Sequence, residues 1–314
     1  MVQLEDVTCR FGDVVAVKDA SLWVGAGTML GLIGPSGSGK TTMVRMLTGT
    51  LRPTSGTIHV LGEQPVRFRR ETRERIGYMP QQFHLYPHLT ASENVAFCAS
   101  LFGLFWWRRH TRVKQVLELV QLTEARNRLA KDLSGGQQRR LSLACALVHE
   151  PDVIFVDEPT AGLDPILRQT VWDEFRRLRE AGKTLFVTTQ TVSDAQFCDG
   201  VAMLVHGSLV AVGAPDALKR EAFGGELIEV RVEGSAQKSV VDRIEGVRSV
   251  QQPAKDRLLI VTDDAGVVAP RVTDALNTSG ARVLTTDKHE PSFDEVFIEL
   301  VERSGMGERE EVAS

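Results

Sequence analysis

The chain has 314 residues, of which 42% are hydrophobic and 25% are charged, and its 37 basic and 41 acidic side chains give a formal net charge of −4. This composition is typical of a globular protein and excludes a disordered, collagen-like or coiled-coil chain. The length predicts about two domains of roughly 150 residues each, and the negative net charge argues against a strongly basic nucleic-acid-binding protein, so we expect no nucleic acid as a partner.

Signals for membrane insertion, secretion and disulfide formation are weak throughout the chain. Residues 1–10 carry three charged side chains, so they do not form the apolar region of a signal peptide. The longest apolar stretch, Val95–Trp107, has 13 residues, whereas a spanning helix needs about 20. We therefore expect that the chain does not cross a membrane by itself. The cysteines stand singly, which predicts neither disulfides nor a zinc site and fits a reducing cytosol; they are Cys9, Cys98, Cys145 and Cys198.

A glycine-rich loop follows an early apolar run. Thr28–Ile33 predicts a buried strand and leads into Gly34–Thr41, which has the pattern G-x-x-x-x-G-K-[ST], and then into a predicted helix from Lys40 to about Thr48. In such a loop, backbone N–H groups and the helix N-terminus converge on phosphate oxygens. The pattern predicts that Lys40 contacts the β- and γ-phosphates and that the Thr41 hydroxyl binds Mg²⁺. The predicted nucleotide contacts here are Gly34, Pro35, Ser36, Gly37, Ser38, Gly39, Lys40, Thr41 and Thr42.

The middle of the chain has a helical pattern. No strand pattern interrupts it, so we expect a mostly helical insert over about residues 85–150. Ser134 stands where a helix N-cap belongs, and the amides of Gly135 and Gly136 behind it predict a second anion site at a helix N-terminus. The apolar residues of one predicted helix face are Val113, Val116, Leu117 and Val120.

Two further apolar runs, Val153–Val156 and Thr184–Thr188, predict buried strands. Continuous runs are typical of a sheet covered on both faces, and the alternation of strands with helices over the first 220 residues predicts an α/β domain with a largely parallel sheet. Asp157 ends the first run, where a carboxylate can hold the Mg²⁺ shell. We expect Glu158, on the opposite side of an extended backbone, to polarise the water that attacks the γ-phosphate.

After about residue 224 the pattern becomes that of a second, smaller domain. Its order β-α-β-β-α-β predicts a small α+β domain of the ferredoxin-like type. The predicted strands and helices are 227–232, 238–244, 247–251, 257–261, 267–276 and 282–285. The predicted divisions are 1–222 for the first domain, 225–303 for the second and 304–314 for a flexible polar tail.

Leu133–Arg140, L-S-G-G-Q-Q-R-R, resembles the signature motif of ATP-binding cassette (ABC) ATPases, and it lies between the phosphate loop and the strand that ends in Asp157. The resemblance covers about residues 1–220. It implies a P-loop NTPase core, with ATP and Mg²⁺ as cofactors and ATP hydrolysis as the activity. It also implies a head-to-tail dimer, in which ATP on the loop of one subunit meets the signature helix of the other. The implied contacts on that helix are Ser134, Gly135, Gly136 and Gln137.

The resemblance implies further roles for single residues. Phe11, in C-R-F-G-D, matches the aromatic that stacks on adenine, although a lone phenylalanine is more often part of a core. Gln81, in Y-M-P-Q, matches the glutamine that contacts Mg²⁺ and the attacking water, and Gln82 is the alternative register. The segment Ala161–Asp164 matches the loop that crosses the dimer interface, so Asp164 is an implied nucleotide contact.

Gln190 departs from the family pattern, which usually has a histidine that senses the γ-phosphate at this point, after the strand ending in T-T. Glutamine donates a neutral hydrogen bond but cannot become cationic, so we expect a weaker γ-phosphate contact. A T-T-Q sequence is similar to that of drug-export ATPases of the daunorubicin-resistance type. Gln190 is therefore interpreted as a trait of that subfamily, and impaired hydrolysis is the alternative.

Three other segments bear on the partner. Residues 290–297, E-P-S-F-D-E-V-F, resemble the ending of exporter ATPases with a small C-terminal domain, and Tyr86–Asn94 resembles the segment that opens the subdomain docking on a membrane partner. Phe105–Trp107 belongs either to that docking face or to the core of the insert, and we favour the core.

The resemblance therefore implies the ATPase subunit of an ABC transporter, of the exporter type, at the cytoplasmic face of the cell membrane. Its implied partners are separate transmembrane permease subunits and a second nucleotide-binding domain, in a homodimer or a heterodimer. Two alternatives stay open: a cassette ATPase that works off the membrane, and a slowly hydrolysing nucleotide-gated regulatory module, which Gln190 motivates.

Overall fold

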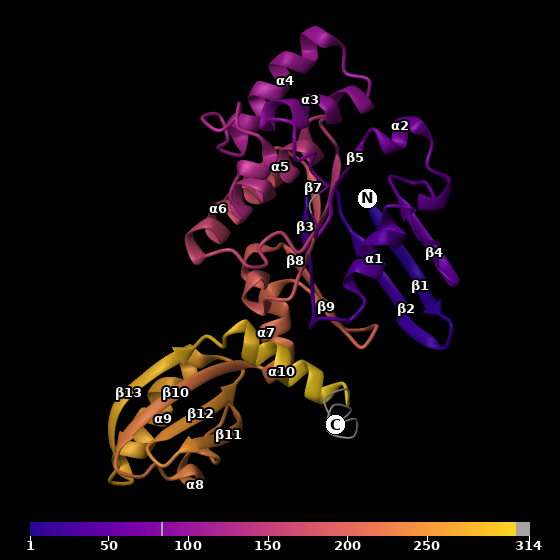
Figure 1. The fold of residues 1–314 in the computed structure, drawn as a ribbon. Helices are drawn as coiled ribbons and strands as arrows, with labels where there is room; N and C mark the ends of the chain where they lie inside the picture. Colours follow the sequence, from indigo (N-terminus) through magenta and orange to yellow (C-terminus); the bar gives the residue numbers. More distant parts are fainter. Residues whose placement is uncertain (83, 306–314) are drawn as a thin grey trace. The chain divides into compact units, whose positions relative to one another are not determined.

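The computed structural model describes residues 1–82 and 84–305, and this part of the chain divides into two compact units (Figure 1). The first unit is Met1–Gly213 and the second is Ala214–Ser314. The predicted first domain, 1–222, includes helix α7 (Pro215–Phe223) up to residue 222, whereas in the structure this helix is part of the second unit. The predicted tail, 304–314, lies outside the described residues except for Ser304 and Gly305.

The first unit is built on a six-stranded sheet in the order β5-β6-β7-β3-β8-β9. All neighbouring strands are parallel except β8 and β9, which are antiparallel. The strands predicted from three apolar runs are confirmed as β3, β6 and β7, and each of them is buried along its whole length. The strands are β3 (Met29–Ile33), β5 (Ile76–Met79), β6 (Val153–Asp157), β7 (Thr184–Thr189), β8 (Gly200–Val205) and β9 (Ser208–Gly213).

A second, antiparallel sheet in the order β2-β1-β4 was not expected from the sequence. It consists of β1 (Val2–Phe11), β2 (Val14–Val24) and β4 (Ser55–Val60). The predicted alternation of strands and helices is therefore wrong for the start of the chain, where β1 and β2 form a hairpin. Register shifts interrupt the pairing of β1 with β2, and Asp6 and Asp19 have positive φ angles of 48° and 43°. These irregularities break the period-two pattern by which strands are recognised.

Helix α1 (Lys40–Leu47) packs between the two sheets of the first unit. Its buried residues Met43, Val44, Met46 and Leu47 share one hydrophobic core with β1 and β4 on one side and with β6 on the other. This core fixes the start of α1, and hence the preceding loop, against the main sheet. Between β4 and β5 the chain forms a 3₁₀ turn (Pro65–Arg67) and α2 (Arg70–Arg73).

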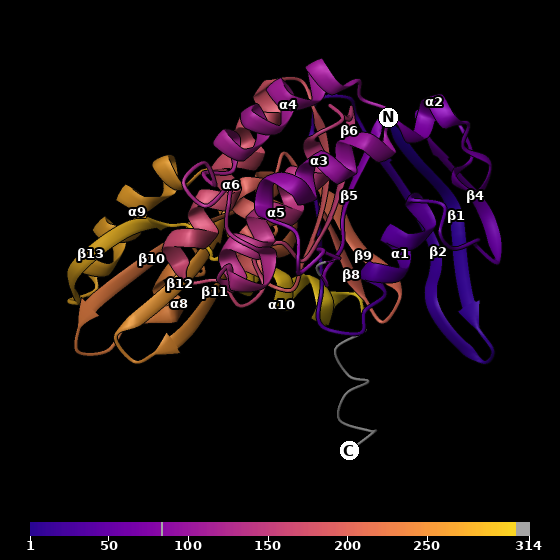
Figure 2. The ribbon, with the colours of Figure 1, turned by 45° about the horizontal axis from the view of Figure 1, so that its top comes forward.

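The helical insert predicted for residues 85–150 is confirmed (Figure 2). Within the described part of this range the structure has helices, one 3₁₀ turn and an isolated bridge between Thr90 and Leu129, but no strand. The helical elements are α3 (Ala91–Leu101), α4 (Trp106–Leu119), the turn Ala130–Asp132 and α5 (Gly135–Leu147). The unit is completed by α6 (Pro165–Glu180) and the 3₁₀ helix Val192–Phe197.

The run Phe105–Trp107 is exposed, so its assignment to the core of the insert is wrong. The reason lies in the orientation of α4. Its buried residues, Val113, Val116 and Leu117, all lie in the second half of the helix. They anchor α4 to the insert and leave its first turn directed toward solvent.

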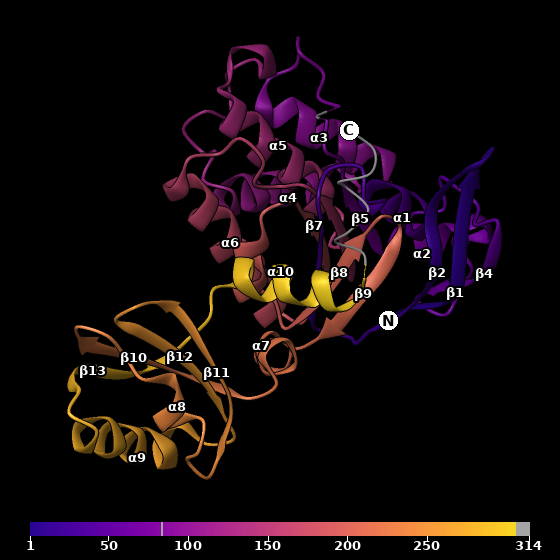
Figure 3. The same ribbon diagram turned by 90° about the horizontal axis from the view of Figure 1, so that it is seen from below.

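The second unit has the β-α-β-β-α-β order predicted from the sequence (Figure 3). Its four strands form an antiparallel sheet in the order β11-β12-β10-β13. The first connecting helix, α8, is one turn long and shorter than predicted. Helices α7 and α10 pack against each other. The elements are β10 (Glu226–Glu233), α8 (Lys238–Val241), β11 (Val247–Ala254), β12 (Arg257–Thr262), α9 (Ala265–Thr278), β13 (Arg282–His289) and α10 (Phe293–Arg303).

Across residues 1–82 and 84–305, every helix falls short of the length and apolar character that a bilayer span requires.

Candidate nucleotide-binding site

The glycine-rich loop joins β3 to α1 at the carboxyl end of the main sheet, where ligands of open α/β sheets gather. Gly39 has a φ angle of 106°, and a Cβ added there would lie 2.2 Å from the carbonyl oxygen of Ala16 in β2. A Cβ added at Gly34 would lie 2.0 Å from the carbonyl oxygen of Leu204 in β8. Glycine is therefore required at both positions by the close approach of neighbouring backbone.

Lys40 is buried within this loop. Its ammonium group donates hydrogen bonds to the carbonyl oxygens of Gly34 at 2.9 Å and Pro35 at 2.8 Å, and it lies 3.7 Å from a carboxylate oxygen of Glu158. Burial lowers the pKa of Lys40, whereas the negative charges of Glu158 and Asp157 oppose that shift. The structure therefore brings the predicted phosphate-binding lysine and both predicted acids to one place.

Two glutamine side chains hold the carboxylate of Glu158 from opposite sides. The Gln81 amide donates to Oε2 at 2.6 Å, and the Gln190 amide donates to Oε1 at 2.7 Å. Gln81 follows β5, Glu158 follows β6 and Gln190 follows β7, so the parallel order of these neighbouring strands brings the three residues together. Gln81, rather than the alternative Gln82, makes the contact with Glu158.

The backbone of Glu158 differs from the extended conformation expected from the sequence. Its φ angle is 49°, a left-handed conformation that is uncommon outside glycine. Its N–H donates to the backbone carbonyl of Thr188 at 3.1 Å and to the Thr188 hydroxyl at 3.0 Å, and Arg139 donates to its carbonyl oxygen at 2.8 Å. These contacts fix the strained turn that directs the Glu158 side chain toward Lys40.

Sequence reasoning missed Thr188 and Arg139, which support the site from different elements. The only available signals were weak: a threonine at the polar end of an apolar strand, and an arginine just after the signature glycines. Neither pattern indicates which carbonyl or hydroxyl the side chain contacts.

Asp157 has one satisfied and one unsatisfied oxygen. Its Oδ1 accepts a hydrogen bond from the Thr188 hydroxyl at 2.5 Å, whereas its Oδ2 is buried without a hydrogen-bond partner among the described residues. The hydroxyl of Ser38, in the phosphate loop, is buried and unpartnered in the same sense. Buried oxygens normally have a partner, so this donor set fits a hard cation such as Mg²⁺, which prefers oxygen ligands and is usually shared with phosphate.

The signature segment begins helix α5 on the exposed surface. Ser134 is its N-cap and forms a capping box with Gln137, in which each side chain accepts from the other's backbone N–H. Gly135 has open space where a Cβ would be, whereas a Cβ added at Gly136 would contact Leu167 of α6. Ser134 and Gln137 make these capping hydrogen bonds with each other, and the next turn of the same helix reaches Glu158, whose carbonyl oxygen accepts from Arg139.

Two other predicted contacts lie on other elements of the first unit. Asp164 caps α6 and accepts hydrogen bonds from the N–H groups of Ile166 and Leu167, both at 3.0 Å. Phe11 ends β1, and 49% of its surface is exposed. The exposed ring is available for stacking. Strand β2, the hairpin partner of β1, includes Ala16, whose carbonyl oxygen lies next to Gly39 of the phosphate loop.

A buried carboxylate, Asp194, links the segments that follow β6 and β7, and sequence reasoning missed it. One oxygen accepts from the indole N–H of Trp172 at 2.8 Å and from the guanidinium of Arg168 at 2.6 Å, and the other accepts from the hydroxyls of Thr160 at 3.2 Å and Thr189 at 2.6 Å. Thr160 lies two residues after Glu158, and Thr189 immediately precedes Gln190. Asp194 therefore fixes the backbone next to both predicted catalytic residues, Glu158 and Gln190.

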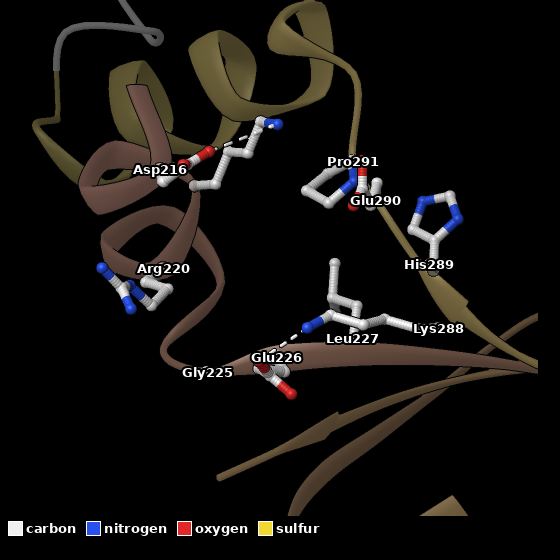
Figure 4. A pocket seen from close by; sticks show the side chains of 10 residues that line it. Asp216, Arg220, Gly225, Glu226, Leu227, Lys288, His289, Glu290 and Pro291 are labelled. Atoms are coloured by element: carbon white, nitrogen blue, oxygen red, sulfur yellow. Dashed lines mark hydrogen bonds and ion pairs between the residues drawn. The ribbon is translucent and has the colours of Figure 1, made fainter. Parts of the chain in front are cut away.

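A separate pocket of about 280 Å³ lies within the second unit, between α7 and the ends of β10 and β13 (Figure 4). Lys288 pairs with Glu226 at 2.7 Å, and Lys219 pairs with Asp216 at 3.8 Å. These charges largely neutralise one another inside the pocket.

Comparisons with known proteins show the family of the chain. The ABC transporter family matches residues 17–161, and the C-terminal domain of the DrrA1-3-like ATP-binding proteins matches residues 213–301. Nod factor export ATP-binding protein I of Burkholderia lata is 35% identical over 304 residues, which cover 96% of this chain and 97% of that protein. Daunorubicin resistance ATP-binding protein DrrA3 of Streptomyces coeruleorubidus is 36% identical over 294 residues, which cover 93% and 92%.

A solved structure supports the same assignment. The dimeric ATP-binding cassette MJ0796, in a post-hydrolysis state with ADP and phosphate, is 30% identical, with a TM-score of 0.63 over 68% of this chain and 98% of that one. The fold class and the resemblance to ABC ATPases are thereby confirmed. The chain belongs to the ATP-binding, ATP-hydrolysing subunits of ABC transporters, in the group that carries a DrrA1-3-like C-terminal domain.

Proposed function

We propose that the cluster around Lys40 binds the triphosphate of ATP and that Glu158 is the general base for its hydrolysis. The observation that carries this proposal is the Glu158 carboxylate, held by the amides of Gln81 and Gln190 and lying 3.7 Å from Lys40. Two neutral donors orient the carboxylate without neutralising it, so it can accept a proton from water. Lys40 and the loop N–H groups bind the phosphates, and Phe11 supplies a face for the adenine.

Mg²⁺ is the metal that this donor set would hold. Thr41, Asp157 and the amide oxygen of Gln81 are the proposed protein ligands, and the unpartnered Asp157 Oδ2 supports this choice. When bound, the metal neutralises phosphate charge. Gln81 then has two functions, because its amide nitrogen donates to Glu158 while its oxygen stays available.

The second half of the site comes from another nucleotide-binding domain. We infer that the N-terminus of α5, with Ser134, Gly135 and Gly136, binds the γ-phosphate of ATP held by the second domain. The N-terminus of a helix attracts anions through its N–H groups and its dipole. The open space at Gly135 leaves room for a phosphate group. ATP thus contacts both domains and favours the closed dimer, because a ligand stabilises the state that binds it.

We further propose that the chain drives export through separate transmembrane subunits at the cytoplasmic face of the membrane. Both curated relatives described above are named for export or drug resistance and span nearly the same length as this chain. The segment between Gln81 and α3 connects the hydrolysis site to the helical insert. Asn94 of α3 bonds to the backbone of Tyr86 and Leu89, and we propose that a movement of Gln81 reaches the insert along this part of the chain.

Comparison of Glu158→Gln with the parent tests the catalytic assignment. We expect the variant to lose about 100-fold or more of the ATPase rate and to retain ATP binding, because glutamine keeps the size and hydrogen-bonding capacity of the side chain. Equal, negligible rates in both proteins would instead favour the nucleotide-gated regulatory module.

A further inference from the structure

An exposed aromatic surface lies at the start of α4, the helix labelled near the top of Figure 1. The exposed fractions of Leu101, Phe105, Trp106 and Trp107 are 68%, 65%, 72% and 55%. The three rings contact one another: Phe105 stacks on Trp107 with centroids 5.1 Å apart, and Trp106 lies edge-on to Trp107 at 5.7 Å. We call the three aromatic residues, together with Arg108, the α4 surface.

Folding of the insert does not require apolar side chains at this place. The second half of α4 supplies the buried residues, so the rings add exposed apolar area without adding to the core. A contiguous apolar group of this size on the surface marks an interaction site. Tryptophan is suited to a boundary between apolar and aqueous surroundings, because its ring is apolar and its N–H is polar.

The segment that carries the α4 surface is cationic, although the whole chain has a net charge of −4. Two acidic residues from other segments, Glu74 and Glu150, line the hollow beside Trp107 and Arg108, and Glu150 lies 3.4 Å from Arg112. Residues 94–117 include three arginines and one lysine and no acidic residue. Arg112 faces inward and donates to the carbonyl oxygens of Leu147 and Val148, whereas Arg108 is exposed. The first turn of α4 has no acidic residue and no side-chain cap, so the positive end of its dipole is not compensated.

A hollow of about 580 Å³ adjoins the rings between α3 and α4. Trp106 and Val113 form part of its apolar wall, and Arg109 and His110 line it as well. Apolar and cationic groups therefore lie side by side in one recess, which matches the junction of an acyl chain with a phosphate headgroup.

We propose that the α4 surface contacts the headgroup region of an anionic lipid bilayer. Aromatic rings are enriched at the membrane interface, and arginines near an anionic leaflet are attracted to its phosphates. A second copy of this chain would present the same positive charge, and a protein partner would need an acidic surface of its own. This inference rests on the proposed function, which brings the chain to a membrane.

Sedimentation of the purified full-length chain with lipid vesicles tests the proposal without the permease. We expect binding to vesicles of phosphatidylglycerol and phosphatidylcholine in equal parts, weakening as salt is added, and little binding to pure phosphatidylcholine. The double variant Trp106→Ser/Trp107→Ser should bind at least about tenfold more weakly, and Arg108→Gln about fivefold more weakly.

The chain offers matched controls for both changes. Trp23 is 69% exposed on β2, and Arg243 is exposed in the second unit, so Trp23→Ser and Arg243→Gln should bind the mixed vesicles like the parent. All variants should keep the parent ATPase rate and thermal midpoint, because the changed side chains are exposed and lie outside the catalytic cluster.

Three results would overturn the lipid proposal. The first is a parent chain that hydrolyses ATP but does not sediment with the mixed vesicles, which leaves the proposed function intact. The second is equal binding to both kinds of vesicle. The third is unchanged vesicle binding of the double variant, and if this variant also no longer co-purifies with a permease, the surface contacts a protein partner. A parent chain without ATPase activity would instead contradict the proposed function.

Discussion

Gln190 stands where the resemblance to ABC ATPases implies a histidine, and its exposed side chain donates a hydrogen bond to the carboxylate of Glu158 at 2.7 Å. We expect Gln190→Ala to lower the ATPase rate about tenfold or more, because the carboxylate loses one of its two orienting hydrogen bonds. Gln190→His should retain activity but acquire a pH dependence between about pH 5 and 8, where histidine titrates. Steady-state rates measured across that range check both expectations, and an unchanged rate in Gln190→Ala would exclude a positioning role for residue 190.

Asp194 is a second residue whose effect reaches the catalytic cluster. Asp194→Asn removes the buried charge that accepts from Arg168, Trp172 and two threonines, and we expect it to lower the free energy of unfolding by about 2 kcal/mol. The matched control is Asp173→Asn, since Asp173 forms an exposed ion pair with Arg176 at 3.1 Å and should cost less than about 0.5 kcal/mol. Urea unfolding monitored by tryptophan fluorescence measures both. Equal costs would show that the buried network does not stabilise the unit.

At the scale of elements, the phosphate loop depends on its contact with β2. Gly37 and Gly39 both have positive φ angles, 77° and 106°, but only Gly39 faces a neighbouring backbone carbonyl. Gly37→Ala should therefore cost about 1 kcal/mol from backbone strain alone. Gly39→Ala should cost more than about 2 kcal/mol, because the loop must also move away from β2. Urea midpoints and ATP affinity distinguish the two variants, and equal effects would contradict the role assigned to β2.

The junction of α5 with β5 should make the first unit sensitive to acid through His149. Its ring stacks on Phe102 with centroids 3.7 Å apart, its Nε2 bonds to the carbonyl of Ile76 at 3.0 Å, and its Nδ1 is buried without a partner among the described residues. Burial lowers the pKa of His149, while the bond to Ile76 opposes the shift. Protonation would place an unpartnered N–H in the interior.

The sign of this effect follows from the lowered pKa. His149 binds a proton at about pH 6.5 in the unfolded chain and only at lower pH in the folded chain. The contribution of neutral His149 to the free energy of unfolding is therefore complete above about pH 6.5, and it is lost as the pH falls toward the pKa of His149 in the folded chain. Between about pH 7.5 and 5.5 the urea midpoint of the parent should therefore fall more than that of His149→Gln. Parallel curves for the two proteins would contradict this account.

The elements best predicted from the sequence were those with a strong local pattern. The apolar runs at β3, β6 and β7 and the β-α-β-β-α-β order of the second unit required no tertiary information. The β1–β2 hairpin was missed because bulges break its alternation. The left-handed turn at Glu158 and the network around Asp194 arise from contacts between residues far apart in the chain. The assignment of Trp106 to the core was wrong. An apolar side chain can be buried in the core of its own chain or can lie exposed at a surface that contacts another molecule, and the sequence pattern does not distinguish the two.

At the scale of the whole molecule, one chain carries two separate groups that can bind phosphate. The Lys40 cluster lies at the carboxyl end of the main sheet, whereas Ser134 caps the exposed N-terminus of a largely buried helix and makes its capping hydrogen bonds with Gln137. Neither group surrounds a triphosphate by itself. A second nucleotide-binding domain placed head to tail would complete both, and this arrangement is the central claim about how ATP is used.

Light scattering of Glu158→Gln with Mg²⁺ and ATP tests that claim most directly, because slow hydrolysis should trap the closed state. The account predicts a dimer with ATP and a monomer without it. A second change, Gly135→Glu, fits its own chain because no described atom beyond its chain neighbours and its own helix backbone lies within 4 Å of an added Cβ, yet it places a carboxylate against the partner's γ-phosphate. The doubly changed protein should bind ATP and stay monomeric. A Glu158→Gln protein that binds ATP but remains a monomer, or a dimer that tolerates Gly135→Glu, would contradict the account.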